Sequence, residues 1–211
     1  MKRILNIAVA VSALALASCG GLMGVDLTKQ ESVDKYLRAA LEKHISPEAV
    51  IYELDLLTIG DFSVNADMSS VTYIAPNGTE LEEWSVPLSG NQDPRKSPGS
   101  VTTIIKRRQA EGGVKLSEID FSQIASNIAK AVAMLDEMED DMEEKTDLKL
   151  DGISRYFIEL SGDPAKIVHK FAIESKAGSE LSTKNGRLST VTNYYEFDFK
   201  ANAAGNVEYV E

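Results

Sequence analysis

The segment from residue 119 to residue 142 constrains the fold of this chain more than any other. Its apolar side chains recur at helical spacing on one face, and acidic side chains occupy the opposite face. Asp120 can cap this helix together with Gln123, and Ile119 can pack against Ile124 as a hydrophobic staple. Such a stripe must be buried against another element of the domain. The stripe consists of Phe121, Ile124, Ile128, Val132, Leu135, Met138 and Met142.

Strands are expected after this helix, where apolar and polar side chains alternate. Phe171 and Ile173 share one face of their strand, and Tyr195, Phe197 and Phe199 share one face of theirs. These faces offer the helix an apolar surface on which to pack. The expected strands are residues 149–160, 166–175, 187–200 and 206–211.

A second helix is expected earlier in the chain, over the apolar periodicity of Val33–Ile45. Thr28 and Glu31 form a Thr-x-x-Glu capping box before it. Pro47 requires the helix to end at the preceding residue. Strands are expected at residues 49–59, 71–74 and 80–86, the last two forming a hairpin around Asn-Gly.

The order of elements is helix then strands, twice over, which predicts an α+β protein built from two helix-plus-antiparallel-sheet units. Gly-Thr-Glu-Leu at residues 78–81 recurs as Gly-Ser-Glu-Leu at 178–181, so a duplicated α-β-β-β(β) repeat is a further hypothesis. The expected divisions are a signal peptide at 1–18, a lipidated Cys and tether at 19–27, a first unit at 28–88, a linker with one strand at 89–118, and a second unit at 119–211.

The N-terminus has the form of an export signal. Lys2 and Arg3 precede an apolar run that is too short for a comfortable transmembrane span. Leu16-Ala17-Ser18-Cys19 then resembles the lipobox of bacterial lipoproteins, in which the thiol of the Cys is lipidated and the signal is cut before it. The chain has a single Cys, so a free thiol in an oxidising compartment is avoided if Cys19 is acylated. The alternative is an ordinary signal peptide that is cleaved elsewhere.

The lipobox resemblance implies a membrane anchor through acyl chains on Cys19. In Gram-negative lipoproteins an Asp after the Cys favours the inner membrane, and here Gly20 and Gly21 stand in those places. We therefore expect an envelope lipoprotein in the outer membrane, facing the periplasm. In element order, export signal and length, the body resembles the tandem units of PepSY-like exported proteins and of beta-lactamase-inhibitor-like folds. A cystatin-like roll around one helix is an alternative architecture.

Charge and composition exclude several functions. The formal net charge of -11 is unsuited to phosphate contacts, so no nucleic-acid partner is expected. One Cys and two His residues exclude a disulfide framework and make a thiolate or imidazole metal cluster improbable. The sequence therefore predicts neither a cofactor nor a metal site.

No catalytic motif emerges from the sequence. His44 is expected to interact with the carbonyls at the end of its helix, and His169 is expected on a buried strand face. The acidic run at 136–147 has the wrong spacing for an EF-hand and is better explained as a solvated helix face. Trp84 is more simply a core residue, although a partner-binding role stays open. The basic residues at 95–96 and 106–108 are expected to be solvated or internally paired.

The function favoured by these observations is binding rather than catalysis. A membrane-anchored module would present a sheet face or hairpin to an envelope protein or peptide. One alternative is a small exported hydrolase with a pair of acids in a pocket, or His169 beside a Ser. Another is a module stabilised by calcium.

Overall fold

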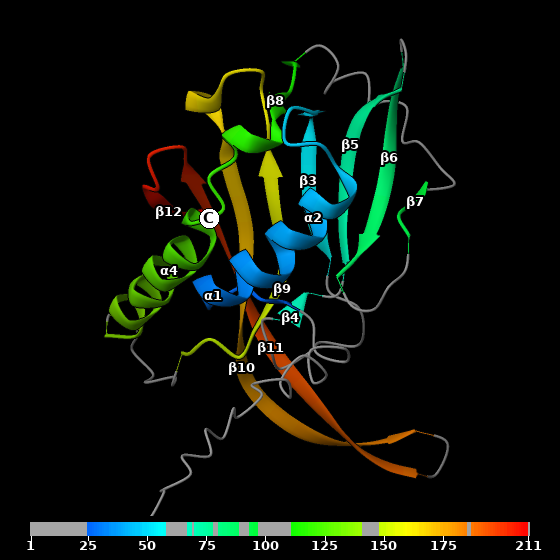
Figure 1. Cartoon of the computed structure of the whole chain (residues 1–211). Coiled ribbons are helices and arrows are strands. Elements are labelled where there is room, and N and C mark those ends of the chain that lie inside the picture. The colour runs from blue at the N-terminus through cyan, green and yellow to red at the C-terminus, as the bar shows by residue number, and fades with distance from the viewer. Residues whose placement is uncertain are drawn as a thin grey trace, which may run out of the picture.

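The protein, seen as a computed structural model, is an α+β fold with one large antiparallel sheet and helices packed on it (Figure 1). This confirms the expected α+β class, although the strands expected in two separate units form one continuous sheet. The structure describes residues 25–57, 67–68, 70–77, 80–88, 93–96, 111–140, 148–184 and 187–210.

The large sheet has eight strands in the order β12-β11-β10-β9-β3-β5-β6-β7, and every neighbouring pair is antiparallel. β3 and β9 are neighbours in the middle of the sheet. From β3 the strands of the first half of the chain continue to the edge at β7, and from β9 the strands of the second half continue to the edge at β12. The strands are β3 (Glu53–Leu57), β5 (Ser70–Asn77), β6 (Glu80–Pro87), β7 (Arg95–Lys96), β9 (Gly152–Glu159), β10 (Val168–Lys184), β11 (Arg187–Asn202) and β12 (Val207–Val210).

Two short ladders complete the strand pairing. β1 (Val25–Asp26) pairs with β4 (Asp67–Met68), and β2 (Val50–Ile51) pairs with β8 (Val114–Lys115). The strand expected at 49–59 is instead two strands, β2 and β3, which are separated at Tyr52. The strand expected inside the linker, near residues 101–107, lies outside the described residues.

The first helix is continuous through α1 (Gln30–Ser32), a π-helical segment at Val33–Arg38, and α2 (Ala39–His44). It ends before Pro47, as expected. The expected capping box is wrong. The Thr28 hydroxyl donates to the Asp26 carboxylate at 2.6 Å, so it does not bond the start of the helix. The buried residues of the first helix are Val33, Leu37 and Leu41.

The second helix, α4 (Gln123–Asp140), follows a single turn at Leu116–Glu118. The Asp120 carboxylate accepts the backbone N–H of Ser122 at 3.0 Å, so Asp120 does cap the entry to the helix. Met142, the last residue of the expected stripe, lies outside the described residues. The buried residues of this segment are Ile119, Phe121, Ile124, Ile128, Ala131 and Leu135.

Both helices contribute to one hydrophobic core with alternate residues of the sheet. Leu54, Tyr156, Phe171 and Phe199 face this core from four adjacent strands. Two helices therefore cover one face of the sheet, which differs from a roll around a single helix (Figure 1). On the other face, which we call the open face, no helix of the described residues lies over the strands.

β10 and β11 extend well beyond the rest of the sheet (Figure 1). β9 pairs with β10 only as far as Glu174, whereas the pairing of β10 with β11 continues to Lys184 and Arg187. We call the part beyond the sheet, residues 176–184 and 187–195, the ribbon. The expected end of this strand at 175 is wrong. In the sequence, Asn-Gly at 185–186 stands between the paired strands, and this dipeptide is a strong hairpin signal.

The two similar tetrapeptides, at residues 78–81 and 178–181, fall at different places in the order of strands. Glu80 and Leu81 begin β6, after the confirmed hairpin with β5, whereas residues 178–181 lie within β10. The two copies are therefore not equivalent in the order of strands.

Candidate functional site

The strand register carries one continuous row of residues across the open face. Each member of the row is the direct cross-strand partner of the next, so their side chains emerge on the same face. Phe157 and Asp55 lie at the middle of the row, where β9 meets β3. From β12 to β7 the row reads Glu208, Lys200, Lys170, Phe157, Asp55, Thr72, Ser85 and Arg95.

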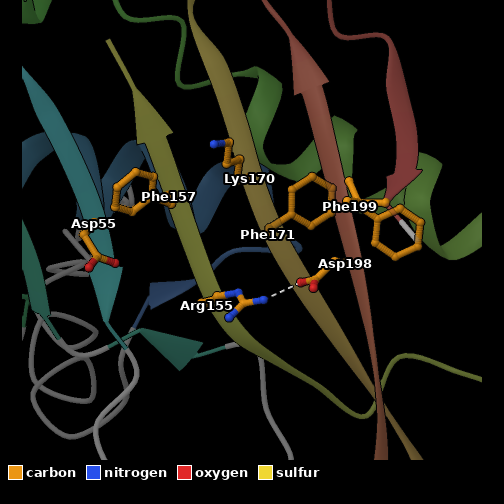
Figure 2. A pocket seen from close by; sticks show the side chains of 8 residues that line it. Asp55, Arg155, Phe157, Lys170, Phe171, Asp198 and Phe199 are labelled. Carbon is orange, nitrogen blue, oxygen red and sulfur yellow. Dashed lines mark hydrogen bonds and ion pairs between the residues drawn. The ribbon is translucent and has the colours of Figure 1, made fainter. Parts of the chain in front are cut away.

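A hollow of about 380 Å³ lies over this region (Figure 2). The open-face residues that border it come from five adjacent strands: Asp55, Phe157, Arg155, Lys170, Asp198 and Val210. Phe171 and Phe199 also border it, but their rings belong to the buried core. The hollow therefore combines an aromatic ring with charges of both signs.

The basic side chains around the hollow already have acidic partners. Arg155 forms ion pairs with Asp198 and, at 3.3 Å, with Glu196. Lys170 bonds Glu159 at 2.9 Å. These pairs cancel the positive charge around the hollow, so an anionic ligand would have to displace an acid that is already in place.

Asp55 is the exception among the acids of the hollow. No described residue donates a hydrogen bond to its carboxylate or forms an ion pair with it. Burial raises the pKa of Asp55 to about 6, and the negative charges of Glu53 and Glu83 add to that rise. A carboxylate in this position is stabilised by any cation that comes to it.

Phe157 is half-buried beside Asp55 on the open face. An aromatic ring next to a carboxylate suits a cation with an aliphatic stem, because the stem packs on the ring while the charged end meets the acid. In chemical terms the hollow can accept a Lys or Arg side chain.

Of the residues selected from sequence for lipid attachment and partner binding, the structure describes only Trp84. Cys19 lies outside the described residues. Trp84 is the cross-strand partner of Tyr73 and packs against the core, on the face that the helices cover. The structure therefore does not bring Trp84 to the hollow.

Sequence reasoning missed Asp55 and Phe157. A signal for Phe157 was present, because Arg155, Phe157 and Glu159 alternate with the buried Tyr156 and Ile158. A large apolar residue between two charged ones on the solvent face of a strand marks a surface position of interest. No local pattern marks Asp55, since Phe157, its aromatic neighbour on the face, comes from another strand.

His169 is a core residue, as expected. It is buried, and its Nδ1 lies 2.9 Å from the Tyr156 hydroxyl. Burial lowers the pKa of His169 to about 4, and the charge of Asp120 opposes that fall. His169 faces away from the hollow, because its strand neighbour Lys170 is the residue that reaches the open face.

Among the described residues, no group of His, Cys, Asp or Glu has an arrangement that could hold a metal ion. The acidic residues at 141–147 lie outside that part of the chain. No helix of the described residues is long and apolar enough to cross a membrane.

Comparison with known proteins gives no match to a family model, to a curated protein or to a solved structure.

Proposed function

We propose that this chain is a membrane-anchored envelope lipoprotein that binds a protein or peptide through the open face of its sheet. The hollow seats a basic side chain of the partner, with Asp55 as the acceptor of its charge and Phe157 as the surface for its stem. The observation that carries this proposal is Asp55, a half-buried carboxylate that has no partner among the described residues.

The charge balance of the hollow supports a cationic ligand. Arg155 and Lys170 are engaged by acids, whereas Asp55 is left beside two further carboxylates. A partner's ammonium or guanidinium group would remove this repulsion when it binds. The shape of the hollow and its charge therefore both favour a basic side chain as the ligand.

The anchor rests on the lipobox at residues 16–19. Acyl chains on Cys19 would hold the fold at the outer membrane on its periplasmic side, because each buried methylene adds about 0.8 kcal/mol to membrane binding. Anchoring concentrates the open face where envelope proteins are found.

The binding proposal is tested by NMR titration of the full-length mature protein in detergent micelles. The probes are four blocked tripeptides, Ala-X-Ala, in which X is Lys, Arg, Gln or Glu. We expect saturable shifts of the Asp55 and Phe157 amides with the Lys and Arg peptides only. Asp55→Asn should abolish these shifts, while Asp136→Asn, on the exposed face of α4, should keep them.

Equal shifts with the Lys and Gln peptides would show that charge is not what the hollow recognises, and the proposal would then be wrong. An unacylated mature chain, revealed by its intact mass, would remove the anchor while leaving the binding result to be judged by itself.

The alternative, a small exported hydrolase, has one observation in its favour. The raised pKa of Asp55 suits a general acid. However, the other acid lining the hollow, Asp198, lies three strands away, at about 14 Å by strand spacing. Glycosidase acid pairs lie within about 10 Å of each other. Asp198 is also held by Arg155, so binding is the better account of this site.

A duplicated origin of the two units is part of the proposal. It is supported by the strand order, in which β3 and β9 are antiparallel neighbours and each is followed outward by the next strands of its own half. The two similar tetrapeptides do not support a duplication, because one begins β6 and the other lies within β10, which are not corresponding strands of the two halves.

A further inference from the structure

The ribbon leaves the sheet at the same end at which the chain enters the fold. β1 pairs with β4, which directly precedes β5, and the first residue of β5, Ser70, is the partner of Leu57 at the end of β3. β3 and β10 run in the same direction, since each is antiparallel to β9. The end of β3 is therefore level with Ala172 of β10, and β10 continues past that level to Lys184 (Figure 1).

The reach of the chain before β1 is short. Val25 is fully buried, and only residues 20–24 separate it from Cys19. At most about 20 Å of extended chain then lies between an acylated Cys19 and the fold. The ribbon extends about 27 Å from Lys176 to Lys184 at the rise of a β-strand. A fold held this close to a bilayer by that end brings the ribbon to the bilayer surface.

The ribbon differs in charge from the rest of the molecule. Residues 176–195 contain three basic residues and one acid, in a chain whose net charge is -11. Two of the basic residues, Lys184 and Arg187, form the last pair of the ribbon, farthest from the sheet. The acidic body is repelled by an anionic membrane, whereas the end of the ribbon is attracted to it within about a Debye length.

We propose that the ribbon contacts the anionic phospholipid headgroups of the membrane that holds the acylated Cys19. This inference rests on the anchor in the proposed function. It gives the molecule two points of attachment, one at the acyl chains and one at the end of the ribbon. Two attachments restrict its rotation on the membrane and so hold the open face in one orientation toward its partner.

The test places a fluorescent label at each end of β10 in the full-length acylated protein. Ser182→Cys, in the ribbon, and Ala165→Cys, in the short turn of Pro164–Lys166 before β10, are each labelled with nitrobenzoxadiazole. An acylated Cys19 has no free thiol, so the label goes to the new Cys alone. The proteins are reconstituted in vesicles of phosphatidylethanolamine with phosphatidylglycerol, containing a headgroup nitroxide quencher.

We expect the label at residue 182 to be quenched about threefold more than the label at 165, because only the ribbon lies within the headgroup layer. Replacing phosphatidylglycerol by phosphatidylcholine should remove most of this difference. The double variant Lys184→Glu with Arg187→Glu should do the same. The matched reversal Lys43→Glu with Lys166→Glu, outside the ribbon, should leave the difference in place.

The outcomes separate the two proposals. Acylated protein with equal quenching at both labels overturns the ribbon contact and leaves the anchor standing. Quenching at 182 that is indifferent to phosphatidylglycerol and to the charge reversal overturns the headgroup contact as stated. A mature chain without acyl groups in its intact mass overturns the anchor, and the ribbon contact with it.

Discussion

At the scale of single residues, two titratable groups have pKa values that burial shifts in opposite senses. Asp55 lies on the open face and His169 lies in the core, on opposite faces of the same sheet. Burial disfavours the charged form of each, so it raises the pKa of the acid and lowers that of the base. Both groups therefore affect stability between about pH 4 and pH 6.5, with opposite signs.

Asp55→Asn is expected to stabilise the unliganded protein at pH 7.5. The folded-state pKa of about 6 exceeds the ordinary carboxyl pKa of 3.8, so the charged carboxylate costs stability above pH 6 and that cost disappears as the pH falls toward 3.8. The shift corresponds to at most about 3 kcal/mol. Urea unfolding at pH 7.5 and pH 4 should show a gain that shrinks at the lower pH. A gain in stability that is the same at both pH values, or an equal gain from Asp136→Asn, would contradict a raised pKa of Asp55.

His169→Gln is expected to reduce the loss of stability in acid. The folded-state pKa of about 4 lies below the ordinary imidazole pKa of 6.5, so the unfolded chain takes up the proton first and stability falls between pH 6.5 and pH 4. Urea unfolding across this range should give a flatter profile for the variant, although its stability at pH 7.5 falls because the contact with Tyr156 is lost. The control is His44→Gln at the end of α2, and an equal flattening there would argue against a role for His169.

At the scale of elements, the short β2–β8 ladder connects the linker to the first half of the chain. Gly113 precedes β8, and a Cβ atom there would lie 2.5 Å from the Ile51 carbonyl oxygen. Real Cβ atoms do not approach a backbone atom that closely, and Ile51 is itself buried, so the backbone has to move.

Gly113→Ala is therefore expected to destabilise the protein by about 1–3 kcal/mol, through displacement of β8 from β2. Chemical denaturation measures the loss. Lys115→Ala, two residues later, removes only an exposed ion pair with Glu48 and should cost less than about 0.5 kcal/mol. Similar costs for the two variants would mean that the ladder tolerates the added methyl group.

At the scale of the whole molecule, the two units share both a sheet and a core. β3 of the first unit pairs with β9 of the second, and Leu54 and Ile158 are buried partners across that seam. Neither half can open without exposing apolar surface of the other. The divisions expected from sequence, at 28–88 and 119–211, thus contribute strands to one continuous structure.

Heating is expected to give a single cooperative unfolding transition in calorimetry, with the calorimetric and van't Hoff enthalpies equal. Leu54→Ala should lower the midpoint of that one transition, since deletion of a buried Leu costs about 2–5 kcal/mol. Two resolved transitions, with only one moved by Leu54→Ala, would show instead that the halves unfold independently.

Much of the fold could be predicted from sequence because it depends on local pattern. The stripe of α4, the limit that Pro47 sets on the first helix, and the hairpin at Asn77-Gly78 each depend on residues close together in the chain. The predictions that were wrong each involve a partner other than the expected one, two residues away in one case and on another strand in the other. Thr28 bonds Asp26 instead of the helix, and β10 continues past residue 175 because β11 supplies a partner.

The sequence by itself determined the α+β class, the acidic charge and the single cysteine, because composition and spacing are properties of the chain alone. Only the tertiary structure decided which residues meet. Asp55 lies beside Phe157 because β3 pairs with β9, two strands almost a hundred residues apart, and its pKa is raised by burial and by the charges of Glu53 and of Glu83 on β6. Such contacts depend on strand order and register, which no local pattern specifies.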